Sequence, residues 1–343
     1  LRRKSVERWT SVAPMVQESQ VVRRAKVALR RVVSISALEI VLVVLLATAW
    51  LWIPVVLLLD LLRKRLRFPL VRLMTFAVCW LSIELLGVLA SIALWVSGNA
   101  RNQNANYALQ RWWANALMVS LRFTCGVRVE VSGTEYVPPG QIMVLSRHTS
   151  LADSLVSAWV LGNKCGRTPR YVLKKELAFD PCLDIVGHRL PNHFVNREAS
   201  DVAGEIASLL TLANHMGDRD AIVIFPEGTR SNPAKRARRL AELSERNPQR
   251  AERLARLRFL LPPKPSGAVA LLESLPNAGV VVCAHTGFDG MDSFTGMLRS
   301  VSRGPVAVRF DLRSIARPVD DPVGWLDSVW LELDARVAIL GGI

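Results

Sequence analysis

Residues 146–153 read Ser146-Arg147-His148-Thr149-Ser150-Leu151-Ala152-Asp153 and lie between two apolar runs. The run 142–145 before them is short enough for a buried strand, and the run 155–161 after them is typical of a helix. His148 is therefore expected where a strand ends and a helix begins. Because ligands of α/β proteins bind at the carboxyl ends of strands, this junction is a candidate site.

The spacing between His148 and Asp153 restricts how the two side chains can meet. Residues five apart on one helix are rotated by about 140°, so contact requires that His148 precede the helix. Ser150 is a good N-cap residue, and Asp153 follows it by three positions, which favours a helix that begins here. Two interpretations follow: a capping box alone, or a carboxylate that also orients His148 for catalysis.

A second polar segment follows another predicted strand. The apolar run 221–225 continues directly into Pro226-Glu227-Gly228-Thr229-Arg230. This segment places a carboxylate, a flexible turn, a hydroxyl and a guanidinium at one strand end. Arginine binds phosphate through two parallel hydrogen bonds, so the set suits a phosphate-bearing ligand. The alternative is a tight turn with a solvated ion pair.

Taken together, the two segments resemble the glycerolipid and lysophospholipid acyltransferase family, in particular 1-acylglycerol-3-phosphate acyltransferases. The matching motifs are His148-x-x-x-x-Asp153 and Phe225-Pro226-Glu227-Gly228-Thr229-Arg230. Residues 194–197, which end in Arg197, and residues 261–267, which contain Lys264, resemble two further blocks of that family. The resemblance covers roughly residues 110–290. One departure is Arg147, where family members often carry Asn.

The resemblance implies a reaction and roles for named residues. A fatty acyl group would move from acyl-CoA or acyl carrier protein to the free hydroxyl of lysophosphatidic acid or a related lysophospholipid. His148 would be the general base and Asp153 would hold its ring. The expected substrate-binding residues are Arg197, Glu227, Gly228, Thr229, Arg230 and Lys264. Neither a metal nor a cofactor is expected. Glycerol 3-phosphate, another lysolipid or an amino-acid lipid are alternative acceptors, and a non-catalytic lipid-binding membrane protein is the alternative class.

The composition favours a protein that works at a membrane. Half of the 343 residues are hydrophobic and the formal net charge is +15. Positive charge beside long apolar runs favours an anionic lipid bilayer as partner, and nucleic acid is not expected. The five cysteines are scattered without a CxxC pair, which argues against a disulfide framework and a structural zinc site.

The first hundred residues divide into a basic tail, 1–31, and a predicted membrane-associated helical hairpin, 32–98. The apolar runs 37–62 and 70–96 are each long enough to cross a hydrocarbon core of ~30 Å. Basic residues flank the first run on both sides, so two arrangements are open. The hairpin either spans the bilayer twice or lies in one leaflet, with the tail, the loop and the catalytic domain all on the cytoplasmic face. Pro54 and Glu84 favour the second arrangement.

Residues 99–343 are predicted to form the acyltransferase domain. Strands alternate with helices here, which indicates an α/β fold with a mixed sheet flanked by helices. Residues 235–258 form an Arg-rich helical insertion. This insertion is either a solvated helix with a packed leucine face or a basic lid that attracts phosphates of coenzyme A or of the lipid surface. The C-terminal helix, about 322–340, is expected to contribute packing alone.

Overall fold

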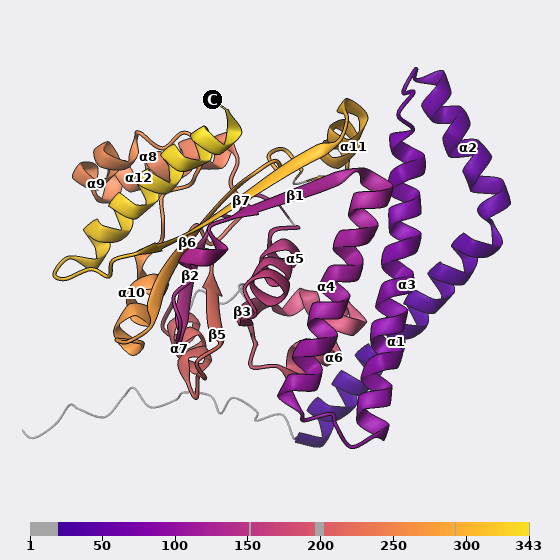
Figure 1. Cartoon of the computed structure of the whole chain (residues 1–343), viewed down its shortest axis with the longest axis horizontal. Helices are drawn as coiled ribbons and strands as arrows, with labels where there is room; N and C mark the ends of the chain where they lie inside the picture. The colour runs from indigo at the N-terminus through magenta and orange to yellow at the C-terminus, as the bar shows by residue number, and fades with distance from the viewer. Residues whose placement is uncertain (1–19, 151, 196–201, 292, 343) are drawn as a thin grey trace, which may run out of the picture.

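The computed structural model describes residues 20–150, 152–195, 202–291 and 293–342. Its first four helices lie beside an α/β body, as Figure 1 shows. They are α1 (Gln20–Ala47), α2 (Ala49–Leu62), α3 (Pro69–Val96) and α4 (Gln103–Cys125). Because α1 begins at Gln20, the predicted border between tail and hairpin at residues 31 and 32 lies inside one helix. Arg30 and Arg31 of this helix both pair with Asp184 of the α/β body, at 2.7 and 2.9 Å.

In the described residues, seven strands form one mixed sheet of order β1-β7-β6-β2-β5-β3-β4. Strands β6 and β7 are antiparallel, and all other neighbouring pairs are parallel. The strands are β1 (Val127–Ser132), β2 (Ile142–Ser146), β3 (Thr168–Lys174), β4 (His193–Val195), β5 (Asp220–Ile224), β6 (Gly279–Thr286) and β7 (Val306–Ile315). The predicted α/β fold with a mixed sheet is confirmed.

Helices cover both faces of this sheet (Figure 1). Ile142 and Val144 of β2 pack on the side of α4 and α5 (Ala152–Trp159). Met143 and Leu145 pack on the other side, with α7 (Val202–Ala213), α10 (Pro265–Ser274) and α12 (Pro322–Gly341). Since both faces are buried, β2 is apolar at successive positions and does not alternate with polar residues. The other α-helices are α6 (Pro181–Arg189), α8 (Pro233–Arg246), α9 (Pro248–Leu254) and α11 (Phe294–Arg303).

The Arg-rich insertion is two helices. Asn232 accepts the N–H of the third residue of α8, and Asn247 does the same for α9. A proline follows each asparagine at the first helical position, where its missing N–H costs nothing. The same Asn-Pro pair that begins α9 therefore ends α8, and the insertion turns at Asn247.

The expected helical hairpin is not confirmed, because the first apolar run is bent by 73° between α1 and α2. Thr48 separates the two helices and its hydroxyl donates to the carbonyl of Val44. The indole N–H of Trp52 donates to the carbonyl of Leu45 at 2.7 Å, which satisfies a carbonyl near the break. Among the described helices, α3 alone is long and apolar enough to cross a membrane, and α1 with α2 reaches that standard only as a bent pair.

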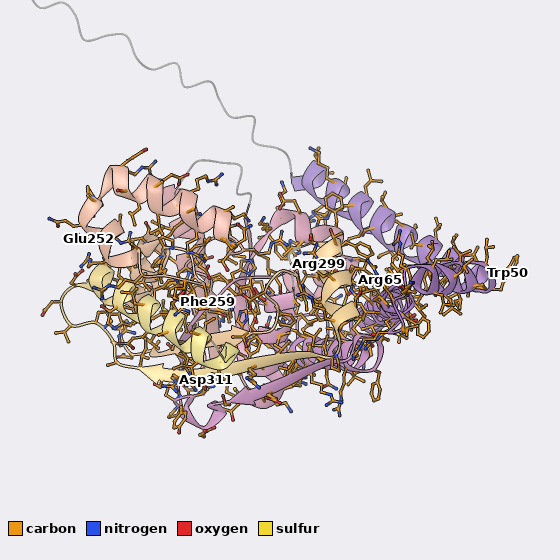
Figure 2. All side chains as sticks on the ribbon, turned by 90° about the horizontal axis from the view of Figure 1, so that it is seen from above. Trp50, Arg65, Glu252, Phe259, Arg299 and Asp311 are labelled. Atoms are coloured by element: carbon orange, nitrogen blue, oxygen red, sulfur yellow. The ribbon has the colours of Figure 1, made fainter. Side chains whose placement is uncertain are left out.

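These N-terminal helices expose many large apolar side chains. They include Ile40, Val43, Val44, Leu46, Trp50, Leu51, Val55, Leu58, Leu62, Leu86, Leu89, Trp95 and Val96. Viewed from above, Trp50 lies at the outer end of this helical segment, far from Glu252 in α9 (Figure 2). Glu84 of α3 is not part of the apolar surface. It is buried, and its Oε1 accepts the indole N–H groups of Trp80 and Trp113.

Candidate active site

The two predicted motifs lie side by side because their strands are parallel neighbours. Leu145 of β2 is in register with Ile224 of β5, so both strands end at the same edge of the sheet. The N–H of His148 donates to Oε1 of Glu227 at 2.8 Å. The N–H of Ser231 donates to the carbonyl of His148 at 2.7 Å. Hydrogen bonds in both directions therefore join the loop after β2 to the turn after β5.

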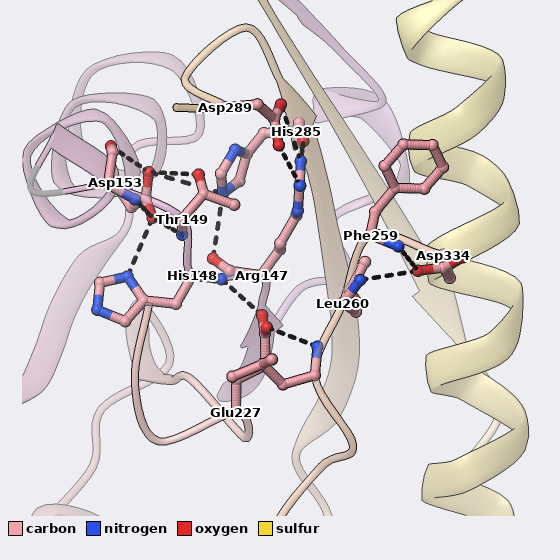
Figure 3. Close-up of polar contacts among 12 residues, drawn as sticks. Arg147, His148, Thr149, Asp153, Glu227, Phe259, Leu260, His285, Asp289 and Asp334 are labelled. Carbon is pink, nitrogen blue, oxygen red and sulfur yellow. Dashed lines mark hydrogen bonds and ion pairs between the residues drawn. The ribbon is translucent and has the colours of Figure 1, made fainter. Parts of the chain in front are cut away.

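His148 lies in the turn before α5, and its Nδ1 is 3.0 Å from Oδ2 of Asp153 (Figure 3). The same carboxylate accepts the N–H groups of Thr149 and Ser150, the latter at 2.8 Å. Its Oδ1 accepts the hydroxyl of Ser150 at 2.7 Å. The Asp153 carboxylate therefore both caps the start of α5 and holds the ring of His148.

The electrostatics of this pair leave one nitrogen of His148 for chemistry. Burial would raise the pKa of Asp153, but His285 and hydrogen bonds from His148 and Ser150 outweigh it and lower the pKa to about 2. An ionised Asp153 only accepts hydrogen bonds, so Nδ1 of His148 carries the proton that it donates. The lone pair is then on Nε2. The imidazole is 20% exposed, lines a cavity and contacts the ring of Phe225 at 4.7 Å between centroids.

Glu227 is fully buried and joins two segments through its two oxygens. Oε1 accepts the N–H of His148, and Oε2 accepts the N–H of Leu261 at 2.9 Å. Burial raises the pKa of Glu227 to about 8, although the two backbone N–H groups oppose the rise. This carboxyl group therefore holds the loop of His148 against residue 261, and it is not among the residues that line the cavity beside His148.

Helix α12 supports the same arrangement from the far side (Figure 3). The carboxylate of Asp334 accepts the N–H groups of Arg258, Phe259 and Leu260, at 2.8 to 2.9 Å. The indole of Trp330 donates to the carbonyl of Leu261 at 3.0 Å. The C-terminal helix, expected to contribute packing alone, thus fixes the segment that Glu227 binds.

A cavity of about 400 Å³ lies beside His148. Its polar end is lined by His148, Gly228, Thr229 and Arg230. The rest is largely apolar, with Leu109, Trp113, Leu155, Ala158, Leu173, Leu177 and Leu183 among its lining residues. A mostly apolar lining with a few polar groups is typical of a site for a small molecule with a large apolar part.

The remaining predicted residues lie near this cavity or outside the described residues. Gly228 has φ +66°, a left-handed conformation that favours glycine, and the Lys264 side chain lies beside it. The N–H of Lys264 donates to the carbonyl of Pro226 at 2.8 Å, which fixes Lys264 against the turn. Arg197 lies outside the described residues.

Sequence reasoning missed a buried polar cluster behind His148. Arg147 is 1% exposed, donates to the carbonyl of His285 at 2.7 Å and forms an ion pair with Asp289. His285 is fully buried and donates from Nε2 to the carbonyl of Arg147 at 3.1 Å. Burial lowers the pKa of His285. The only signal in the sequence was a charge directly after a buried strand, and the partner strand could not be known without the sheet order.

Several backbone N–H groups near His148 already have acceptors. Those of Thr149 and Ser150 donate to Asp153, and that of Gly228 donates to the carbonyl of Phe225. For the N–H of Thr229, which lines the cavity, the described residues provide no acceptor. Within the described ranges, no cluster of three or more His, Cys, Asp or Glu residues could hold a metal ion.

Comparison with known proteins found a matching family model and a similar solved structure. Residues 128–285 match the family model described as Acyltransferase. Among solved structures, the chain is similar to the crystal structure of the 1-acyl-sn-glycerophosphate (LPA) acyltransferase PlsC from Thermotoga maritima. That match has a TM-score of 0.46 and 14% identity, and covers 75% of this chain and 95% of that one. A search of curated proteins found no match. The match to this family model confirms the predicted acyltransferase resemblance for residues 128–285.

Proposed function

We propose that this acyltransferase moves a fatty acyl group from an acyl thioester to the free hydroxyl of lysophosphatidic acid or a related lysophospholipid, at a membrane surface. The observation that carries the proposal is the position of His148. Its Nδ1 is held by Asp153, and its ring lines a cavity that is apolar at one end and carries Arg230 at the other. A lysophospholipid has the same division between an acyl chain and a phosphate.

In the proposed mechanism, the acceptor hydroxyl attacks the thioester carbonyl carbon directly. As the new C–O bond forms, Nε2 of His148 takes the hydroxyl proton, and the Asp153 carboxylate stabilises the resulting imidazolium. The N–H of Thr229 is the donor that we propose for the developing oxyanion. Collapse of the tetrahedral intermediate breaks the C–S bond, and the imidazolium returns its proton to the leaving thiolate. The products are an ester and a free thiol, and this mechanism uses no group beyond the two substrates.

Arg230 is the residue that we propose for the acceptor phosphate, with Arg197 as a second contact. A guanidinium can bind a phosphate through two parallel hydrogen bonds, which fixes the glycerol relative to His148. Thr229 and Lys264 lie at the same turn and would complete the polar end. Gly228 lets the backbone turn here without a side chain in the way.

The exposed apolar helices supply the proposed route for the lipid. Helices α1, α2 and α3 expose many large apolar side chains, which favours contact with a bilayer. Trp50, Trp80 and Trp95 on this surface suit the interface between lipid and water. We place the catalytic domain at the cytoplasmic face, where anionic lipids attract the basic tail and the basic segment 63–67.

The proposal is tested by acyl transfer with purified protein in detergent, using palmitoyl- or oleoyl-CoA and a panel of acceptors. Wild type is compared with His148→Ala and with a control, His215→Ala, which removes an exposed histidine that does not line this cavity. We expect product with lysophosphatidic acid from wild type and control, and none above background from His148→Ala. Near-normal turnover by His148→Ala would show that His148 is not the general base. Product only with another acceptor would correct the substrate.

A further inference from the structure

A second cavity meets the first one at the turn beside His148. It measures about 810 Å³ and is lined by parts of α7, α8 and α10 and by residues 262–265. Both cavities include Val172, Phe225 and Gly228 in their lining, so they adjoin at these residues. We call the second cavity the basic groove. A ligand that lies in it can place one end at His148.

The walls of the basic groove differ in chemistry. Five basic side chains line it, namely Arg238, Arg239, Arg246, Arg250 and Lys264. Its apolar lining residues, from β3, α7 and β5, include Val172, Ile206, Leu209 and Val223. Glu242 is the one carboxylate among its described lining residues. The groove therefore combines excess positive charge with an apolar wall.

Protein carboxylates neutralise part of this charge. Arg250 is 2.7 Å from Asp327 and also donates to the carbonyl of Pro263, so its place is structural. Arg238 pairs with Glu242 at 3.4 Å, and both side chains are well exposed.

For Arg239, Arg246 and Lys264, the described residues provide no carboxylate within ion-pair distance. Arg239 is half-buried in the wall, and Lys264 lies beside Gly228. These three cations therefore line the groove without a carboxylate partner among the described residues, so an anionic ligand could bind them.

We infer that the basic groove binds the nucleotide phosphates of an acyl-coenzyme A donor on Arg239 and Arg246. This inference rests on the proposed function and names its donor. The pantetheine arm of coenzyme A is slender and would follow the apolar wall toward Gly228, with Lys264 along its path. The thioester then lies where the two cavities meet, beside His148, and the acyl chain enters the first cavity. The diphosphate and the ribose phosphate are the groups that arginine forks bind best.

The shape of the site favours coenzyme A over an acyl carrier protein. A carrier protein is a folded, acidic domain, and it would need basic side chains on an exposed face. Here the unpaired cations line a concave wall, and one of them is half-buried. The strongly basic surface of α8 and α9 outside the groove would attract either donor at long range but does not select between them.

Binding of coenzyme A itself tests the inference without any transfer reaction. Isothermal titration calorimetry would compare wild type with the double variant Arg239→Ala/Arg246→Ala, since alanine keeps the helix stable. The matched control is Arg256→Ala, which removes one exposed arginine of the same insertion outside the groove.

We expect the Kd for coenzyme A to rise by about tenfold or more in the double variant and to stay unchanged in the control. Pantetheine, which lacks the phosphates, should bind all three proteins equally. An unchanged Kd in the double variant would overturn the inference. The inference would also be overturned if wild type did not bind coenzyme A but bound acyl carrier protein through these arginines.

Initial rates separate this inference from the proposed function. With palmitoyl-CoA, the KM of the double variant should rise about tenfold while kcat holds. With palmitoyl-pantetheine, neither constant should change. Coenzyme A binding that depends on the arginines, with no transfer to any acceptor, would refute the proposed reaction and leave the groove assignment standing. Acyl transfer by the double variant with an unchanged KM for palmitoyl-CoA would refute the groove assignment and leave the proposed reaction standing.

Discussion

Replacing Asp153 with Asn separates the charge of this side chain from its hydrogen bonds. Oδ2 accepts from Nδ1 of His148 and from the N–H groups of Thr149 and Ser150, so an amide oxygen at that position can keep all three bonds. The amide nitrogen then lies at the Oδ1 position, where the Ser150 hydroxyl can rotate to accept. The variant is expected to fold with His148 in place and to lack only the negative charge.

The pKa of Asp153 gives the expected loss of stability. The folded-state pKa is about 2, below the ordinary value of 3.8, so the folded state favours the carboxylate. At about 1.4 kcal/mol per pH unit, this shift stabilises the fold by about 2 kcal/mol at pH 7. The stabilisation is present above pH 3.8 and is lost as the pH falls through about 2. Asp153→Asn should therefore lower the free energy of unfolding by about 2 kcal/mol at pH 7.

The effect on catalysis should be larger than the effect on stability. At 3.0 Å and an effective dielectric constant near 20, the attraction between imidazolium and carboxylate is about 5 kcal/mol, which is an upper limit. The charge is needed only when His148 becomes protonated, so the loss falls on kcat. We expect kcat to drop by about 10² to 10⁴.

Steady-state kinetics with lysophosphatidic acid and palmitoyl-CoA would measure the catalytic effect, and urea unfolding at pH 7 would measure the stability. A KM that stays within about twofold of wild type would show that the substrates still bind. A variant with wild-type kcat would refute the reasoning, because the carboxylate would then play no part in stabilising the imidazolium. A loss of stability far above 2 kcal/mol would show that Asp153 acts mainly as a cap.

Three further substitutions test other parts of the site. In Glu227→Gln, the amide N–H₂ faces a backbone N–H of His148 or Leu261, so unfolding free energy should fall by about 1–3 kcal/mol. The pKa of Glu227 is about 8 in the folded state and 4.5 in the unfolded state. The free energy of unfolding of the wild type should therefore fall as the pH rises from 4.5 to about 8. The difference between wild type and Gln variant in urea unfolding should therefore shrink by about 1.4 kcal/mol per unit from about pH 5.5 to 7, and a constant difference would contradict a buried protonated carboxyl. Arg230→Ala should raise the acceptor KM about tenfold and leave the thioester KM unchanged, and equal effects on both would argue against a phosphate contact. Gly228→Ala should lower the free energy of unfolding by about 1 kcal/mol, because φ is +66° at this position. The added Cβ would lie 3.4 Å from the Lys264 side chain, an ordinary contact, so the cost comes from the backbone conformation. An unchanged melting temperature would show that the turn tolerates alanine.

The sequence allowed the α/β class and the contact of His148 with Asp153 to be predicted, because both depend on local patterns. Apolar runs of strand length bounded by turns identify β2 and β5, and Ser150 marks where α5 can begin. The parallel register then brings Glu227 to His148, as expected of two strands that end at one edge. These features can be predicted without knowing that β6 lies next to β2 or that α12 contacts segment 258–261.

Features that depend on distant contacts could not be predicted in this way. The role of Glu227 required Leu261, and the role of α12 required Asp334 to reach residues 258–260. The buried pairing of Arg147 with the carbonyl of His285 depends on β6 lying next to β2. Likewise, apolar composition located the exposed apolar helices but not the 73° bend at Thr48.

The dependence of the site on α12 sets an order of events during synthesis of the protein. A ribosome produces α1 to α3 before it produces the residues that carry Trp330 and Asp334. The exposed apolar helices are therefore complete while segment 258–261 still lacks its partners in α12, and Glu227 has no fixed N–H at Leu261. In a nascent chain, the loop of His148 would therefore be held in place only after α12 has been made and has packed against segment 258–261.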